Sequence, residues 1–187
     1  MDEVIGIQAV RAALRDTPSL ARNLYLMKGR RDARFNELDI DKAVTELTYG
    51  SLNMAGQICV AAARFLVHSS IAKRFEERMI AAYRAVRVGR GSDPASTMGS
   101  LIDLSSQQRL LRLIEQAGDE GRMILQGGWD GAGAFLTPTL FGIEDVTSSL
   151  VQEELFGPIV SLETFEDEAE AIYKANATPY GLAASVF

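Results

Sequence analysis

The chain has 187 residues, 47% of them hydrophobic, and it carries a formal net charge of −6 at pH 7. This length allows one sizeable hydrophobic core, whereas the acidic balance and the scattered lysines and arginines argue against a nucleic-acid partner. One cysteine excludes an internal disulfide, and because there is neither an apolar run of ~20 residues nor a basic start typical of a signal peptide, we expect no membrane segment and a cytoplasmic location.

The first quarter of the chain alternates between helical and strand patterns. Apolar spacing predicts a helix over residues 5–16 and a strand over residues 23–27. Asp39 is a residue type favoured at helix N-caps, and it predicts a second helix that runs to about Leu52.

The next two elements have the clearest patterns. A strand is predicted over residues 64–68, and Ser69 and Ser70 are candidate N-caps for the helix that follows it. Apolar residues recur in that helix at helical spacing: Ile71, Phe75, Met79 and Tyr83.

The second half continues the alternation. A helix over about residues 105–117 is expected to end at Gly118, a typical C-cap. Alternation of strands and helices predicts an α/β fold, with a mostly parallel sheet and helices on both of its faces. The remaining predicted elements are strands over residues 123–126, 135–141, 159–165 and 182–187 and a helix over residues 167–175.

Cys59 is the candidate nucleophile. It follows the small-residue turn Met54-Ala55-Gly56-Gln57-Ile58 and precedes the predicted strand 64–68, which places its thiol at the end of a sheet. Gly56 would allow the backbone to approach a ligand closely. The alternative is that Cys59 fills the core, since most lone cysteines behave as small buried hydrophobic residues.

A second segment lies far along the chain, Gln152-Glu153-Glu154-Leu155-Phe156-Gly157-Pro158. The pair of patterns, Gly-Gln-x-Cys and Glu-x-Phe-Gly-Pro, resembles the catalytic domain of the NAD(P)-dependent aldehyde dehydrogenase superfamily, over roughly residues 7 to 187. Further matches occur in the family order: Asp39-Ile40-Asp41-Lys42-Ala43, Met98-Gly99-Ser100-Leu101-Ile102, Leu136-Thr137-Pro138-Thr139-Leu140 and Pro179-Tyr180-Gly181-Leu182-Ala183.

The resemblance implies an oxidoreductase in which Cys59 attacks an aldehyde and hydride then passes to NAD or NADP. A thiolate is a strong nucleophile, and the resulting thioester can be hydrolysed to the acid. The resemblance also implies that Glu154 accepts hydrogen bonds from the nicotinamide-side ribose and that Phe156 packs beside the nicotinamide. The alternative for this pair is a solvated carboxylate and a core aromatic. His68 is the single histidine, and we expect it to be a surface or packing residue and no metal site to exist.

The chain also departs from the family pattern. An alignment without gaps places Tyr25 where the family has its general-base glutamate, and a phenol, with a pKa of about 10, is a poor base at neutral pH. Acidic residues occupy the expected phosphate-side motif, within Asp2-Glu3-Val4-Ile5-Gly6-Ile7. We therefore expect residues 1–187 to form a single catalytic domain, without the coenzyme-binding domain and the C-terminal segment, and the isolated chain to be inactive.

Two other functions fit the same sequence. One is a non-catalytic structural or oligomerisation domain, similar to the degenerate aldehyde-dehydrogenase-like domain of long proline-utilisation proteins. The other is a variant that acylates coenzyme A, since such members of the superfamily do without the base glutamate. In each case the apolar strand predicted over residues 182–187 would be an exposed edge, so we expect a homo-oligomer.

Overall fold

The computed structural model describes residues 24–27 and 33–187. Their strands form one six-stranded sheet in the order β3-β4-β5-β2-β1-β6. All neighbouring strands are parallel except β3, which is antiparallel to β4. The mostly parallel α/β sheet is thereby confirmed. The strands are β1 (Leu24–Met27), β2 (Arg64–His68), β3 (Arg122–Leu125), β4 (Thr139–Gly142), β5 (Ile159–Phe165) and β6 (Ser185–Val186).

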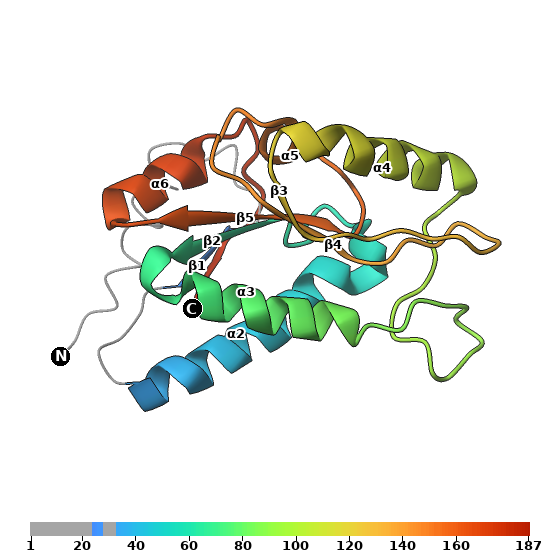
Figure 1. The fold of residues 1–187 in the computed structure, drawn as a ribbon, viewed down its shortest axis with the longest axis horizontal. Coiled ribbons are helices and arrows are strands. Elements are labelled where there is room, and N and C mark those ends of the chain that lie inside the picture. The colour runs from blue at the N-terminus through green and yellow to red at the C-terminus, as the bar shows by residue number, and fades with distance from the viewer. Residues whose placement is uncertain (1–23, 28–32) are drawn as a thin grey trace.

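Helices cover both faces of the sheet, with α2 and α3 below it and α6 above it in the view of Figure 1. The alternation of side chains along β2 shows how this happens: the Phe65 ring meets Phe75 of α3 edge-on at 6.0 Å, whereas Leu66 packs with Ala171 of α6. The helices are α2 (Ala33–Leu52), α3 (Ser69–Arg84), α4 (Leu104–Gln116), α5 (Ser149–Gln152) and α6 (Glu168–Asn176), with 3-10 turns η1 (Asn53–Gly56) and η2 (Ala117–Asp119).

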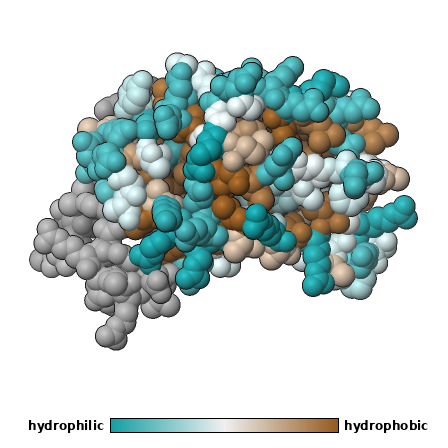
Figure 2. Space-filling model, in the orientation of Figure 1, coloured by the Kyte–Doolittle hydropathy of each residue, from teal (hydrophilic) through white to brown (hydrophobic). Residues whose placement is uncertain are grey.

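The main hydrophobic core lies between the sheet and the helices α2, α3 and α4. In the space-filling view, apolar residues gather in the middle of the face and hydrophilic residues surround them (Figure 2). The four residues predicted at helical spacing in α3 are all buried, so its amphipathic pattern is confirmed: Ile71, Phe75, Met79 and Tyr83.

Several predicted boundaries were wrong. Helix α2 begins at Ala33 and not at Asp39, because residues 33–38 contain no glycine or proline that would end a helix. The N-cap of α3 is His68, whose Nδ1 accepts a hydrogen bond from the backbone N–H of Ser70 at 3.2 Å. The predicted helix over residues 5–16 lies outside the described residues.

Two predicted strands are shorter than expected. Strand β4 begins only at Thr139, since the preceding Pro138 has no N–H to donate to a ladder. Strand β6 is reduced to two residues, with Ser185 exposed and Val186 half-buried, and it lies at the edge of the sheet as expected for this segment. None of the helices within residues 33–187 is long and apolar enough to cross a bilayer.

Candidate active site

The candidate site lies at the amino ends of β2 and β5. These strands are parallel, with Arg64 opposite Ser161, so the segments that precede them emerge at the same end of the sheet. Cys59 comes shortly before β2, and Glu154 and Phe156 come shortly before β5. All three line one small pocket. The structure thus brings the three predicted site residues together.

The turn before Cys59 has an unusual backbone. Met54, Ala55 and Gly56 all have positive φ, at 51°, 55° and 73°. Gln57 holds this turn: its side-chain amide donates to the Met54 carbonyl oxygen at 3.0 Å, and its Oε1 accepts from the Ile102 N–H at 2.8 Å. A left-handed non-glycine residue costs about 1–3 kcal/mol, and such strain is typical of functional sites.

The Cys59 thiol is exposed and does not fill the core. A tight turn carries it, in which the Ala61 N–H donates to the Ile58 carbonyl at 3.0 Å. The next residues are tied back to α2 by the Ala62 N–H, which donates to the Gly50 carbonyl at 3.0 Å. The thiol can therefore meet a reagent from solvent, while its catalytic role stays a prediction.

A hydrogen bond from helix α4 holds the acidic loop that carries Glu154 and Phe156. Leu155 is buried, and its carbonyl oxygen accepts from Nη2 of Arg109 on α4 at 2.6 Å. Its neighbours Glu154 and Phe156 face outward, with Phe156 43% exposed and at a φ of 54°. The alternative of a core aromatic at Phe156 is therefore wrong.

A buried polar pair supports the site from the helix side. Ser51 also lines the pocket. Its hydroxyl oxygen lies 2.7 Å from the hydroxyl oxygen of Tyr83, and its hydroxyl donates a hydrogen bond to the Leu47 carbonyl oxygen at 2.6 Å. Burial raises the pKa of Tyr83, and the hydrogen bond with Ser51 lowers it by less. Tyr83 is therefore a protonated structural support.

The comparisons with known proteins agree with this geometry. The model of the "Aldehyde dehydrogenase family" matches residues 34–187. The chain belongs to the aldehyde dehydrogenase family. It is 38% identical over 155 residues to a succinate-semialdehyde dehydrogenase of Paenarthrobacter nicotinovorans, covering 82% of this chain and 34% of that protein. It is 35% identical over 156 residues to betaine aldehyde dehydrogenase 1 of Oryza sativa subsp. japonica, covering 81% and 31%.

Solved structures of related proteins share the fold of this chain. The betaine aldehyde dehydrogenase of Staphylococcus aureus in complex with NAD+ has a TM-score of 0.77 at 35% identity, covering 89% of this chain and 32% of that one. Proline utilization A of Bdellovibrio bacteriovorus has a TM-score of 0.80 at 29% identity, covering 89% and 17%. The chain spans about one third of the length of the curated relatives that it matches.

The positions of Tyr25 and His68 complete the description of the predicted residues. Tyr25, where the alignment without gaps expects the base glutamate, lies on β1 beside Phe65 of β2, near the sheet end that carries Cys59. His68 lies at the other end of β2, where it caps α3 and meets the Phe165 ring edge-on at 5.4 Å. Within the described part of the chain, no group of three or more His, Cys, Asp or Glu residues could hold a metal ion.

The exposed residues of the pocket fit part of a nicotinamide coenzyme. The Glu154 carboxylate is exposed and can only accept, which suits a pair of ribose hydroxyls. The Phe156 side chain offers an accessible aromatic surface beside it.

Arg109 and the anchoring role of Gln57 were not predicted. Gln57 had a signal in the Gly-Gln-x-Cys motif, whereas nothing in the sequence singles out Arg109.

Proposed function

We propose that this chain carries the nucleophile and part of the coenzyme site of an NAD(P)-dependent aldehyde dehydrogenase, with Cys59 as the nucleophile. The observation that supports this most directly is that Cys59, exposed a few residues after the strained turn at residues 54–56, shares one pocket with Glu154 and Phe156. Thiols placed in this way can attack a carbonyl carbon and leave a thioester that water then cleaves.

The proposed reaction balances with one water. The Cys59 sulfur adds to the aldehyde carbon, and the carbonyl oxygen takes up a proton to give a thiohemiacetal. NAD+ or NADP+, when bound, would supply the acceptor for the hydride that leaves this carbon. As the hydride leaves, the hydroxyl proton is released and a thioester on Cys59 results. Water attacks the thioester, the carbon–sulfur bond breaks, and the acid and the free thiol are released.

Glu154 and Phe156 are proposed to orient the coenzyme. The Glu154 carboxylate would accept from two vicinal hydroxyls, and Phe156 would pack against the nicotinamide side and exclude water from it. Gln57 and Arg109 would hold the two loops in place through the hydrogen bonds described above. The relatives are named for different aldehydes, so the proposal extends to the reaction and not to one substrate.

The first experiment needs no coenzyme. An activated ester such as p-nitrophenyl acetate should acylate the chain once, at Cys59, and the Cys59→Ser variant should not be acylated. Intact-mass measurement before and after proteolysis locates the acyl group. Absence of acylation in the folded chain would overturn the role of Cys59 as a nucleophile.

The second experiment tests the redox step. The chain is mixed with NAD+ or NADP+ and a panel of short aldehydes, and the absorbance of the reduced coenzyme is followed. We expect at most slow turnover, because Tyr25 replaces the base expected for thioester hydrolysis. Any reduced coenzyme that depends on Cys59 rejects a purely structural role. Thioester formation only on addition of coenzyme A would instead favour the acylating variant.

Association is part of the same proposal. Among the described strands, β3 and β6 are the edges of the sheet, and edge strands pair readily with other chains. We therefore expect a homo-oligomer, measured by light scattering at micromolar concentration. A single monomeric species would contradict this expectation.

A further inference from the structure

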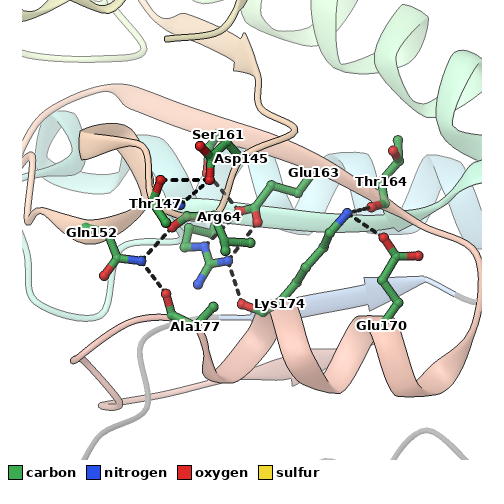
Figure 3. A network of polar contacts seen from close by, with 11 residues as sticks. Arg64, Asp145, Thr147, Gln152, Ser161, Glu163, Thr164, Glu170, Lys174 and Ala177 are labelled. Carbon is green, nitrogen blue, oxygen red and sulfur yellow. Dashed lines mark hydrogen bonds and ion pairs between the residues drawn. The ribbon is translucent and has the colours of Figure 1, made fainter.

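The carboxyl end of α6 accepts hydrogen bonds from two distant parts of the chain. The first comes from Arg64, at the start of β2 (Figure 3). Its Nε and Nη2 donate to the two carboxylate oxygens of Glu163, each at 2.8 Å, and Nη2 also donates to the Lys174 carbonyl at 2.8 Å. The Arg64 and Glu163 side chains are only 6% and 1% exposed. Such a bidentate pair is strongly directional.

The second contact comes from Gln152, the last residue of α5. Its side-chain amide donates to the Val146 carbonyl at 2.6 Å and to the carbonyl of Ala177, the C-cap of α6. Gln152 immediately precedes the acidic loop that carries Glu154. The end of α6 is therefore tied to the chain just after Cys59 through Arg64 and to the chain just before Glu154 through Gln152, as Figure 3 shows for both side chains.

The two loops meet with almost no spare room. A Cβ atom on Gly56 would lie 2.3 Å from the Gly157 carbonyl oxygen. On the other side, a Cβ on Gly157 would lie 2.3 Å from Leu110 Cδ1. A small shift of either loop therefore changes the pocket between Cys59 and Glu154, and such a shift is what a tie at both loops prevents.

We propose that Arg64, Glu163 and Gln152, together with the last turn of α6, form a positioning bracket that fixes the separation between Cys59 and the Glu154–Phe156 loop. The bracket acts on backbone carbonyls and strands and touches no reacting atom, so its members are positioning residues. Its value to catalysis rests on the proposed function, but its geometry can be tested without coenzyme or aldehyde.

The test compares two alkylating reagents on the single thiol of the full chain. Iodoacetate is anionic and iodoacetamide is neutral, and both react with the same Cys59 thiolate. The fraction of ionised thiol affects both rates equally and drops out of their ratio. The ratio of the two rates therefore reports the negative charge near the sulfur. Glu154→Gln calibrates the ratio, which should rise by roughly two- to fivefold at low salt, the size expected for one carboxylate about 4–8 Å away in water.

Gln152→Ala is the main variant. We expect the rate ratio to rise at least halfway to the value of Glu154→Gln, because the released loop lets Glu154 move away from Cys59. Gln107→Ala is the matched control: Gln107 also donates to two backbone carbonyls, those of Gly133 and Phe135, but lies outside the bracket. Its ratio should equal that of the unmodified chain even though it too loses hydrogen bonds.

The buried pair needs a different substitution, because removing one partner leaves a charge uncompensated and can unfold the chain. The double variant Arg64→Met with Glu163→Leu replaces both charges by apolar groups of similar volume, and circular dichroism checks that it folds. We expect its rate ratio to rise as in Gln152→Ala.

Three outcomes would overturn the proposal. First, the Gln152→Ala variant and the double variant could both fold and show the same rate ratio as the unmodified chain, which would show that the bracket does not position the loops. A rise of the same size in Gln107→Ala would show general loosening. An unchanged ratio in Glu154→Gln would show that Glu154 does not face Cys59. A failure of aldehyde oxidation alone would leave these ratios unaffected and would bear only on the proposed function.

Discussion

Gly56 and Gly157, which precede β2 and β5 in the chain, are in direct backbone contact. Gly56 has a φ of +73°, and the space where its Cβ would lie is taken by the carbonyl group of Gly157, 2.3 Å from the oxygen. A carbonyl group is part of the backbone and cannot rotate away as a side chain can. The approach of the Cys59 turn to the Glu154 loop therefore depends on glycine at position 56.

Gly56→Ala should destabilise the chain and displace the two loops. The left-handed backbone alone costs about 1–2 kcal/mol for a residue with a Cβ, and the contact with Gly157 adds to that cost. Urea unfolding measures the loss. Gly128→Ala is the control, because nothing lies within 4 Å of its Cβ position, and it should unfold close to the unmodified chain. Equal stability of the two variants would contradict the close contact.

Cys59 should be alkylated in the folded chain without prior unfolding. Its side chain is exposed, so iodoacetamide should react about as fast under native conditions as in urea. A thiol reachable only in the unfolded chain would react slower by the unfolding equilibrium constant, on the order of 10³ or more. Timed labelling followed by mass spectrometry decides, with Cys59→Ser as the unlabelled control.

Tyr25→Glu should accelerate release of the acyl group from Cys59. A carboxylate can activate water where a phenol cannot, and general-base catalysis contributes about 10²- to 10⁴-fold. Deacylation after p-nitrophenyl acetate treatment, followed by intact mass, measures the rate. Tyr25→Phe is the control and should release the acyl group as slowly as the unmodified chain. An equally slow Tyr25→Glu variant would contradict the assignment of position 25 to the base.

Stability should fall in acid because two carboxylates accept hydrogen bonds at the starts of helices, Asp103 as the N-cap of α4 and Glu120 from Ser148 and Ser149 at the start of α5. The Ser106 N–H donates to Asp103 at the start of α4 and lowers its pKa, and the Ser148 and Ser149 hydroxyls lower the pKa of Glu120. Both groups stabilise the fold above their ordinary pKa of about 4, because the unfolded chain takes up protons first as the pH falls. The stabilisation is lost as the pH falls through the lower folded values.

Urea midpoints between pH 7 and pH 3 measure this dependence. The double variant Asp103→Asn with Glu120→Gln should show a shallower decline in acid, while Asn retains the N-cap preference at neutral pH. An identical decline in the variant and in the unmodified chain would show that other groups carry the acid sensitivity.

Local patterns were enough to predict most elements and to single out the candidate site residues that the structure places in one pocket. The apolar runs of β2 and β5 and the helical spacing in α3 depend on residues close in sequence, and these elements agree with the structure. Cys59 and Glu154 were predicted from short motifs, because each motif carries its own glycine and polar residues. The resemblance to aldehyde dehydrogenases also came from these motifs and agrees with the match over residues 34–187.

Tertiary contacts decided the features that the spacing of apolar residues does not predict, namely helix caps, buried ion pairs and the meeting of distant loops. The cap of α3 is His68 and not a serine, and it also packs against Phe165 from a strand far along the chain. Arg64 and Glu163, 99 positions apart, form a buried pair that exists only in the register of β2 with β5. The same parallel register carries the Cys59 turn and the Glu154 loop to one end of the sheet. The amino-acid sequence by itself thus determined most strands and indicated the candidate site residues, whereas the meeting of these residues in one pocket required long-range backbone pairing, which has no local signal.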